Sequence, residues 1–189
     1  MDRQEYENHE IPTHTYLGAV GMPGRTAYFG LNYVGKPKKG ETLVVSAASG
    51  AVGSVVGQLG KHNGLKVIGI AGGEMKCNFV KNELGFDECI DYKSPNFKDT
   101  LISSCNDGID IYFENVAGIT LEAVLPNMNN FGRIAVCGMI SWYSGKGVQD
   151  SMAFPKFWRT VLVKRLMAKG FIIFDHKASF NEFWEEVSP

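Results

Sequence analysis

The chain has 189 residues, of which 44% are hydrophobic and 21% charged, and its formal net charge is −1. This is the composition of a soluble globular domain without the basic excess that nucleic-acid binding requires. No apolar run is long enough to span a bilayer and the acidic start, MDRQEYENHE, is unlike a signal peptide, so we expect a cytoplasmic protein with no nucleic-acid or membrane partner.

A helix is expected to begin near Pro23 and to lead into a loop, NYVGKPKKGE (residues 32–41). From Glu41 onward, short runs rich in Val, Ile, Phe and Tyr alternate with stretches of helical periodicity. The expected strands are TLVVSA (42–47), KVIGIA (66–71), ECIDY (88–92), GIDIYFE (108–114), GRIAVCG (132–138) and GFIIF (170–174).

The alternation of strands and helices predicts right-handed βαβ units in a parallel sheet. Uninterrupted apolar strands indicate that helices cover both faces. The predicted fold class is therefore α/β, a Rossmann-type doubly wound six-stranded parallel sheet with helices on both faces. Residues 41–189 would form this domain, and residues 1–40 an N-terminal extension with a helix leading into it.

A glycine-rich turn follows the first expected strand. Its Ala47-x-x-Gly50-x-x-Gly53 core has the spacing of a dinucleotide fingerprint, with alanine in the first place. Gly50 would let the backbone approach a pyrophosphate, which the N-terminus of the next helix attracts. Small residues also serve plain helix–sheet packing, but the strand before and the helix after favour binding. The predicted pyrophosphate site consists of Gly50, Ala51, Val52, Gly53 and Ser54.

The end of the second expected strand favours NADP(H) over NAD(H). An NAD site usually has an acidic residue there, about 20 residues after the turn, to bind the ribose 2′-hydroxyl. Here Ala71, Gly72 and Gly73 occupy that place, and Lys76 and Tyr92 follow. A lysine and a phenol fit a 2′-phosphate, although the local pattern explains Lys76 equally well as an exposed helical residue.

The four cysteines contain no C-x-x-C pair, so neither a zinc site nor a thioredoxin-type motif is supported. We expect no metal, and free thiols in a reducing compartment.

Seven segments occur in order from about Tyr16 to the C-terminus: GMPGRTAYFGL, SAASGAVGSVVGQLGK, AGGEMKC, LGFDECIDYKS, GIDIYFENVAG, FGRIAVCGMISWY and KGFIIFDH. Together they resemble the zinc-free medium-chain dehydrogenase/reductases, in the alkenal/one oxidoreductase branch of prostaglandin reductases and bacterial curcumin-type NADP-dependent reductases. The resemblance implies NADPH-dependent reduction of the C=C bond in α,β-unsaturated aldehydes or ketones, with a small enal or enone as substrate.

The resemblance also implies roles for particular residues. Lys76 and Tyr92 match ligands of the 2′-phosphate, and Tyr143 matches the catalytic tyrosine, with a loop aromatic covering the cofactor edge as its alternative. Arg25 and Ala117 depart from the pattern, which commonly has an apolar residue and a glycine there. The further cofactor contacts implied are Asn115, Cys137, Gly138, Ile140, Ser141, Tyr143, Phe171, Ile172 and Ile173.

Members of this family also have an N-terminal barrel-like catalytic domain, for which about forty residues before the first strand are too few. We therefore expect the chain to be the nucleotide-binding domain without that domain and without the C-terminal end, and to be inactive in this form. A stand-alone NADP(H)-binding or sensing module is the alternative, and a zinc alcohol dehydrogenase fragment is weakly supported. The exposed edge of the sixth strand predicts a homodimer or self-association.

Overall fold

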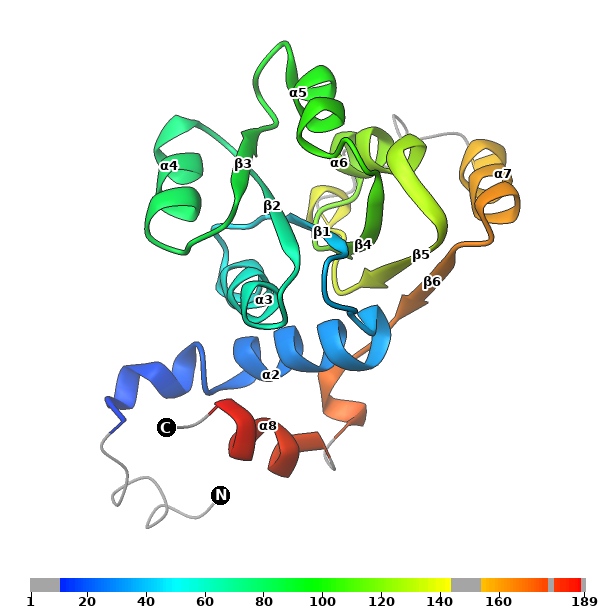
Figure 1. The fold of residues 1–189 in the computed structure, drawn as a ribbon. Coiled ribbons are helices and arrows are strands. Elements are labelled where there is room, and N and C mark those ends of the chain that lie inside the picture. The colour runs from blue at the N-terminus through cyan, green and yellow to red at the C-terminus, as the bar shows by residue number, and fades with distance from the viewer. Residues whose placement is uncertain (1–10, 144–153, 177–178, 188–189) are drawn as a thin grey trace.

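The computed structural model describes residues 11–143, 154–176 and 179–187, and its six strands form one parallel sheet in the order β3-β2-β1-β4-β5-β6 (Figure 1). The strands are β1 (Thr42–Ser46), β2 (Lys66–Ala71), β3 (Glu88–Asp91), β4 (Ile109–Glu114), β5 (Met128–Val136) and β6 (Met167–Gly170). The α-helices are α2 (Met22–Phe29), α3 (Ala51–His62), α4 (Glu74–Asn82), α5 (Phe97–Ser104), α6 (Gly118–Val124), α7 (Phe154–Lys164) and α8 (Ser179–Val187). None of the helices in the described ranges has the length and apolar character needed to cross a membrane.

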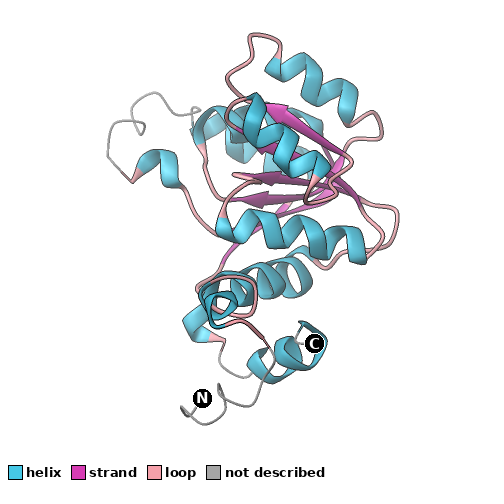
Figure 2. Ribbon diagram, turned by 90° about the vertical axis from the view of Figure 1, so that its left-hand side faces the viewer, coloured by secondary structure: helices cyan, strands magenta, loops and turns pink. Residues whose placement is uncertain are grey.

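Helices cover both faces of the sheet, because alternate residues of each strand point to opposite sides. On β1, Leu43 and Val45 belong to a core cluster with residues of α2, α3 and α4. Val44 belongs to a second cluster, to which α5, α6 and α7 contribute. Figure 2 shows the strands lying between these helices. The strand order and the two covered faces confirm the predicted Rossmann-type fold.

Helix α3 packs closely on the sheet because two of its glycines leave no side chain in the way. A Cβ atom at Gly53 would lie 2.3 Å from the carbonyl oxygen of Ala47, and one at Gly57 would lie 1.7 Å from Cζ of Phe86. Neither position has room for a larger residue without a shift of its neighbours. Tight helix packing, which the sequence suggested for Gly53, is therefore part of this glycine's role.

The sixth strand lies earlier in the chain than the sequence suggested. Strand β6 ends at Gly170, and all four of its residues are exposed. The apolar character of the segment expected as a strand, residues 170–174, has another cause. Phe171 and Ile173 turn into the core, where the Phe171 ring packs 5.6 Å from that of Phe29. Apolar residues at alternate positions thus mark a buried connection here, not a strand.

Two further differences concern helices. The expected loop at residues 32–41 begins within a π-helix, η2 (Gly30–Gly35), that directly continues α2. Helix α5 was not anticipated, since only Phe97 and Leu101 of its residues are buried and the rest of its surface faces solvent.

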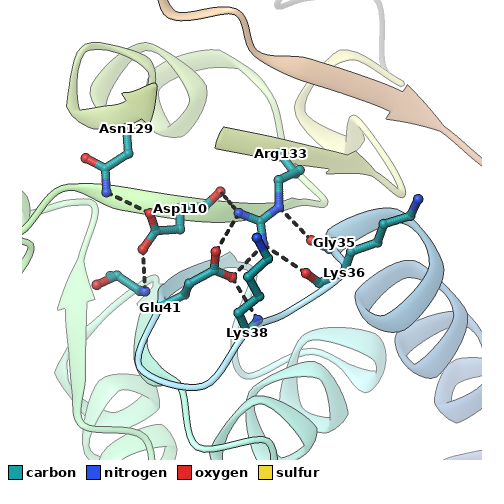
Figure 3. Close-up of polar contacts among 8 residues, drawn as sticks. Gly35, Lys36, Lys38, Glu41, Asp110, Asn129 and Arg133 are labelled. Atoms are coloured by element: carbon teal, nitrogen blue, oxygen red, sulfur yellow. Dashed lines mark hydrogen bonds and ion pairs between the residues drawn. The ribbon is translucent and has the colours of Figure 1, made fainter. Parts of the chain in front are cut away.

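An arginine network joins the amino ends of the central strands (Figure 3). Arg133 on β5 donates to both carboxylate oxygens of Glu41, at 2.9 and 2.5 Å, and also to the carbonyl oxygens of Gly35 and Lys36. The Arg133 and Glu41 side chains are only 15% and 18% exposed. Burial alone would raise the pKa of Glu41, but the hydrogen bonds from Arg133 and the Lys38 backbone, together with the positive charges of both residues, outweigh it and the pKa is lowered. This network fastens η2 to the sheet at the edge opposite the carboxyl ends of the strands.

Candidate functional site

A cavity of about 780 Å³ lies at the carboxyl ends of the strands. It spans the point between β1 and β4 where the strand order reverses, which is where open α/β sheets bind ligands. Residues at the ends of β1 to β5 or in the segments after them line it: Ala47, Ser49, Gly50, Ile70, Ala71, Gly72, Met75, Lys76, Phe79, Tyr92, Lys93, Val116, Ala117, Ile119, Thr120, Ile140 and Ser141.

The turn after β1 leaves open space at Gly50. Ala47 adopts a left-handed conformation with φ 49°, where the fingerprint usually has its first glycine. Gly50 has the extended backbone of a helix N-cap and has no side chain with which to cap α3. A Cβ atom there would lie 3.1 Å from the Ala47 carbonyl oxygen and 4.0 Å from the Ala47 Cβ. The free N–H groups of the first turn of α3 are therefore available to an anion in the cavity.

The turn after β2 is built around the phenol of Tyr92. A Cβ atom at Gly72 would lie 2.8 Å from Cε1 of Tyr92, so an acidic side chain at this position would displace the ring. The Asp91 carboxylate accepts hydrogen bonds from the backbone N–H groups of Gly73 and Lys93, both at 2.9 Å, and these bonds lower the pKa of Asp91. Asp91 therefore fixes this turn.

Two lysines lie at this end of the cavity. Lys76 and Tyr92 both line it, as the 2′-phosphate prediction requires, and Lys93 lines it as well. Sequence reasoning missed Lys93, although it directly follows Tyr92 in the segment IDYK. Lysine ammonium groups and a phenol are donors that suit a phosphate, and the three residues that carry them line this cavity.

Apolar side chains on two helices form the neighbouring walls. Met75 and Phe79 on α4 and Ile119 on α6 are exposed and line the cavity. The sequence analysis missed all three. Met75 and Phe79 are four residues apart and so share one face of α4, whereas Val80 reaches the core. Exposed apolar residues at helical spacing on a face other than the core face were the available signal. These apolar side chains and the lysines line the same cavity, which suits a ligand with a flat aromatic base and a nearby phosphate group.

The loop after β5 folds over the turn after β4. The backbone N–H groups of Ile140 and Ser141 donate to the carbonyl oxygens of Asn115 and Val116, both at 3.1 Å. The Asn115 side chain does not line the cavity. Its Nδ2 donates to the carbonyl oxygen of Ser46 at 2.8 Å and thus ties the end of β4 to the end of β1.

Tyr143 lies outside the cavity lining and its side chain is 70% exposed. Its hydroxyl oxygen accepts a hydrogen bond from the backbone N–H of Met139 at 3.2 Å, so the ring folds back toward Gly138. The sequence also predicts a loop at residues 141–151, SWYSGKGVQDS, and the part of it after residue 143 lies outside the described residues. Of the loop residues predicted to contact the cofactor, Ile140 and Ser141 line the cavity. Cys137 does not line it, and burial raises the pKa of its thiol to about 11.

The predicted residues after β6 do not line the cavity. Phe171 and Ile173 are buried in the core, and Ile172 between them is exposed. Arg25 lies outside the cavity lining too, with its guanidinium 4.7 Å from the centre of the Phe180 ring on α8. Of the predicted site residues, the structure gathers Gly50, Lys76, Tyr92, Ile140 and Ser141 around one cavity.

The chain is similar to known proteins over most of its length. The sequence model of the family described as zinc-binding dehydrogenase matches residues 51–188. The chain is 47% identical to the NADPH-dependent curcumin reductase of Escherichia coli, over 90% of this chain and 50% of that protein. It is 46% identical to the NADP(+)-dependent 2-alkenal reductase of Nicotiana tabacum, over 95% of this chain and 52% of that protein. The crystal structure of CurA from Vibrio vulnificus in complex with NADPH has a TM-score of 0.89 and 49% identity, over 95% of this chain and 54% of that chain. The chain thus spans about half the length of these relatives.

Proposed function

Because the chain belongs to the zinc-binding dehydrogenase family, in its curcumin and alkenal reductase branch, we propose that it is the NADP(H)-binding half of a C=C reductase. Its substrates would be α,β-unsaturated aldehydes or ketones. One observation carries the proposal: a single cavity joins the open backbone at Gly50 to Lys76 and Tyr92. Within the described ranges, no group of three or more His, Cys, Asp or Glu side chains is placed to hold a metal ion.

Each part of the cavity would receive one part of the cofactor. Gly50 and the N-terminus of α3, formed by residues 51–54, would hold the pyrophosphate. Lys76, Tyr92 and Lys93 would hold the 2′-phosphate, and the apolar walls would flank the adenine. Asn115, residues 137–141 and residues 171–173 would complete the nicotinamide end.

Bound NADPH would supply the hydride that adds to the β-carbon of the substrate. The chain contributes the surface on which the cofactor lies and the phenol of Tyr143. A phenol can donate a hydrogen bond to the ribose or to the carbonyl oxygen of the substrate as negative charge develops there. The exposed position of Tyr143 leaves its ring accessible to such a partner.

Replacing Lys76 with alanine is expected to weaken NADPH binding by about 1–3 kcal/mol, the free energy of a lost charge-assisted hydrogen bond, and to leave NADH binding nearly unchanged. Fluorescence titrations with both nucleotides at one salt concentration measure this. Lys81 on the same helix forms an ion pair with Glu88 at 3.0 Å, outside the cavity lining, so Lys81→Ala is the matched control. Equal losses for NADPH and NADH in Lys76→Ala would refute the 2′-phosphate assignment.

We also propose that two copies associate along β6. This strand lies at one edge of the sheet, and its residues are exposed. On α7, Leu162 and Val163 add exposed apolar surface. An open strand edge with exposed apolar side chains on the preceding helix promotes pairing with a second chain. Light scattering over a concentration series should show a dimer, and Leu162→Glu should shift it toward monomer. A monomer of the unaltered chain at high concentration would argue against this association.

A further inference from the structure

A buried carboxylate, Glu114, lies directly behind residues that line the cavity. It ends β4 and is 2% exposed. Its Oε1 atom accepts four hydrogen bonds, from the backbone N–H groups of Val116 and Ala117 at 2.7 and 2.8 Å and from the hydroxyls of Ser46 and Tyr112 at 3.0 Å. Its Oε2 atom is buried and has no hydrogen-bond partner among the described residues.

Stability of the fold does not explain a carboxylate at this place. A buried carboxyl group loses its hydration, and an oxygen without a partner leaves that loss uncompensated. The four hydrogen bonds to one oxygen therefore indicate a role in holding the neighbouring backbone in place.

The backbone that Glu114 holds is the turn after β4, which contains a strained residue. Ala117 has φ 65° and ψ −158°, a backbone conformation that is essentially restricted to glycine. The N–H of this strained residue donates to Glu114, as does the N–H of Val116 before it. Both Val116 and Ala117 line the cavity. Glu114 thus holds a strained piece of the cavity wall in place.

Hydrogen bonds also connect Glu114 Oε1 to the segments that follow β1 and β5. The Ser46 hydroxyl, which donates to Glu114, accepts the backbone N–H of Asn115 at 2.8 Å at the end of β1. The carbonyl oxygen of Val116 accepts both the backbone N–H and the hydroxyl of Ser141, in the loop after β5. The positions of three strand-end segments around the cavity therefore depend on one carboxylate oxygen.

We propose that Glu114 is a positioning residue for the dinucleotide, which acts by fixing the turn at Val116–Ala117 and, through it, the loop at Ile140–Ser141. This inference rests on the proposed NADP(H) site. Only Oε1 does the positioning, so a neutral amide can replace the carboxylate. In Glu114→Gln, the amide oxygen keeps the four hydrogen bonds and the amide nitrogen takes the place of Oε2.

The test compares three variants of the whole chain by NADPH fluorescence titration, below the unfolding temperature of each. Glu114→Leu keeps the volume but removes the acceptor, and its Kd for NADPH is expected to rise at least about tenfold. Glu114→Gln should stay within about threefold of the unaltered chain. Arg133→Met breaks the network at the opposite edge of the sheet, so it should lower the unfolding temperature without changing the Kd.

Three outcomes would overturn the positioning role: unchanged binding in Glu114→Leu, an equal loss in Arg133→Met, or an equal loss in Glu114→Gln. If Glu114→Leu does not fold, Ser46→Ala serves instead, because it removes the hydroxyl between Glu114 and Asn115 at little change in volume. It should weaken NADPH binding about threefold or more, and unchanged binding would contradict the inference. Failure of the unaltered chain to bind NADPH would refute the proposed function itself.

Discussion

Replacing Gly50 with valine is expected to weaken NADPH binding at least about a hundredfold while the chain stays folded. The backbone of Gly50, with φ −82° and ψ 170°, is accessible to a β-branched residue. Within the protein, the new Cβ atom would lie 4.0 Å from the Ala47 Cβ and 3.1 Å from the Ala47 carbonyl oxygen, which would have to shift by a few tenths of an ångström. The rest of the side chain would occupy the space where we place the pyrophosphate.

Gly53→Ala is the contrasting variant in the same turn. Its Cβ atom would lie 2.3 Å from the Ala47 carbonyl oxygen and 3.1 Å from Cα of Ala48, so the backbone between β1 and α3 would have to move. Overpacking of this kind lowers the free energy of unfolding by about 1–3 kcal/mol. Circular dichroism and thermal unfolding, measured beside the nucleotide titration, separate the two effects. Unimpaired NADPH binding in Gly50→Val would refute the pyrophosphate site at this turn, and the glycines would then serve only the packing of α3.

The parts of the fold that the sequence predicted are those set by local pattern. The first five strands were found because each is a short apolar run between turn residues. The sixth strand was misplaced because apolarity records burial and not conformation: Phe171 and Ile173 are buried outside any strand, whereas the residues of β6 are exposed.

The candidate site divides in a similar way. Gly50 was predicted from the glycine-rich turn, and Lys76 and Tyr92 from the missing acid after the second strand and from the family resemblance. All three line the cavity, and their contacts with a cofactor stay predictions. Glu114 was not singled out, because in the segment GIDIYFE it is simply the polar end of a strand. Its importance depends on Ser46, 68 residues away in sequence, and on the shape of the following turn. No periodicity or spacing contains that information.

Expressed as these 189 residues, the chain is expected to bind NADPH and to reduce an enal at close to the uncatalysed rate. Reduction requires the C=C bond to lie at near-attack distance from the nicotinamide in a water-poor site, and an error of ~1 Å costs about a hundredfold in rate. The described residues form the cavity in which we place the cofactor, but Tyr143 is 70% exposed and lies outside its lining. Among the described residues, none forms a wall around this phenol that would hold a substrate against it.

Because the chain spans about half the length of its relatives, the matched experiment joins it to the N-terminal half of the Escherichia coli curcumin reductase. Oxidation of NADPH in the presence of an enal, followed by absorbance, should then rise by at least about a hundredfold over the chain alone, as alignment of the substrate is restored. Tyr143→Phe in this chimera should lower kcat without a matching change in NADPH affinity, since the lost hydroxyl acts on the substrate or ribose during the reaction. Robust reduction by the 189 residues alone would show that they already form the whole pocket. A chimera that binds NADPH but turns over no enal would favour a binding or sensing module instead, because the same cavity would then hold the nucleotide without presenting it to a substrate.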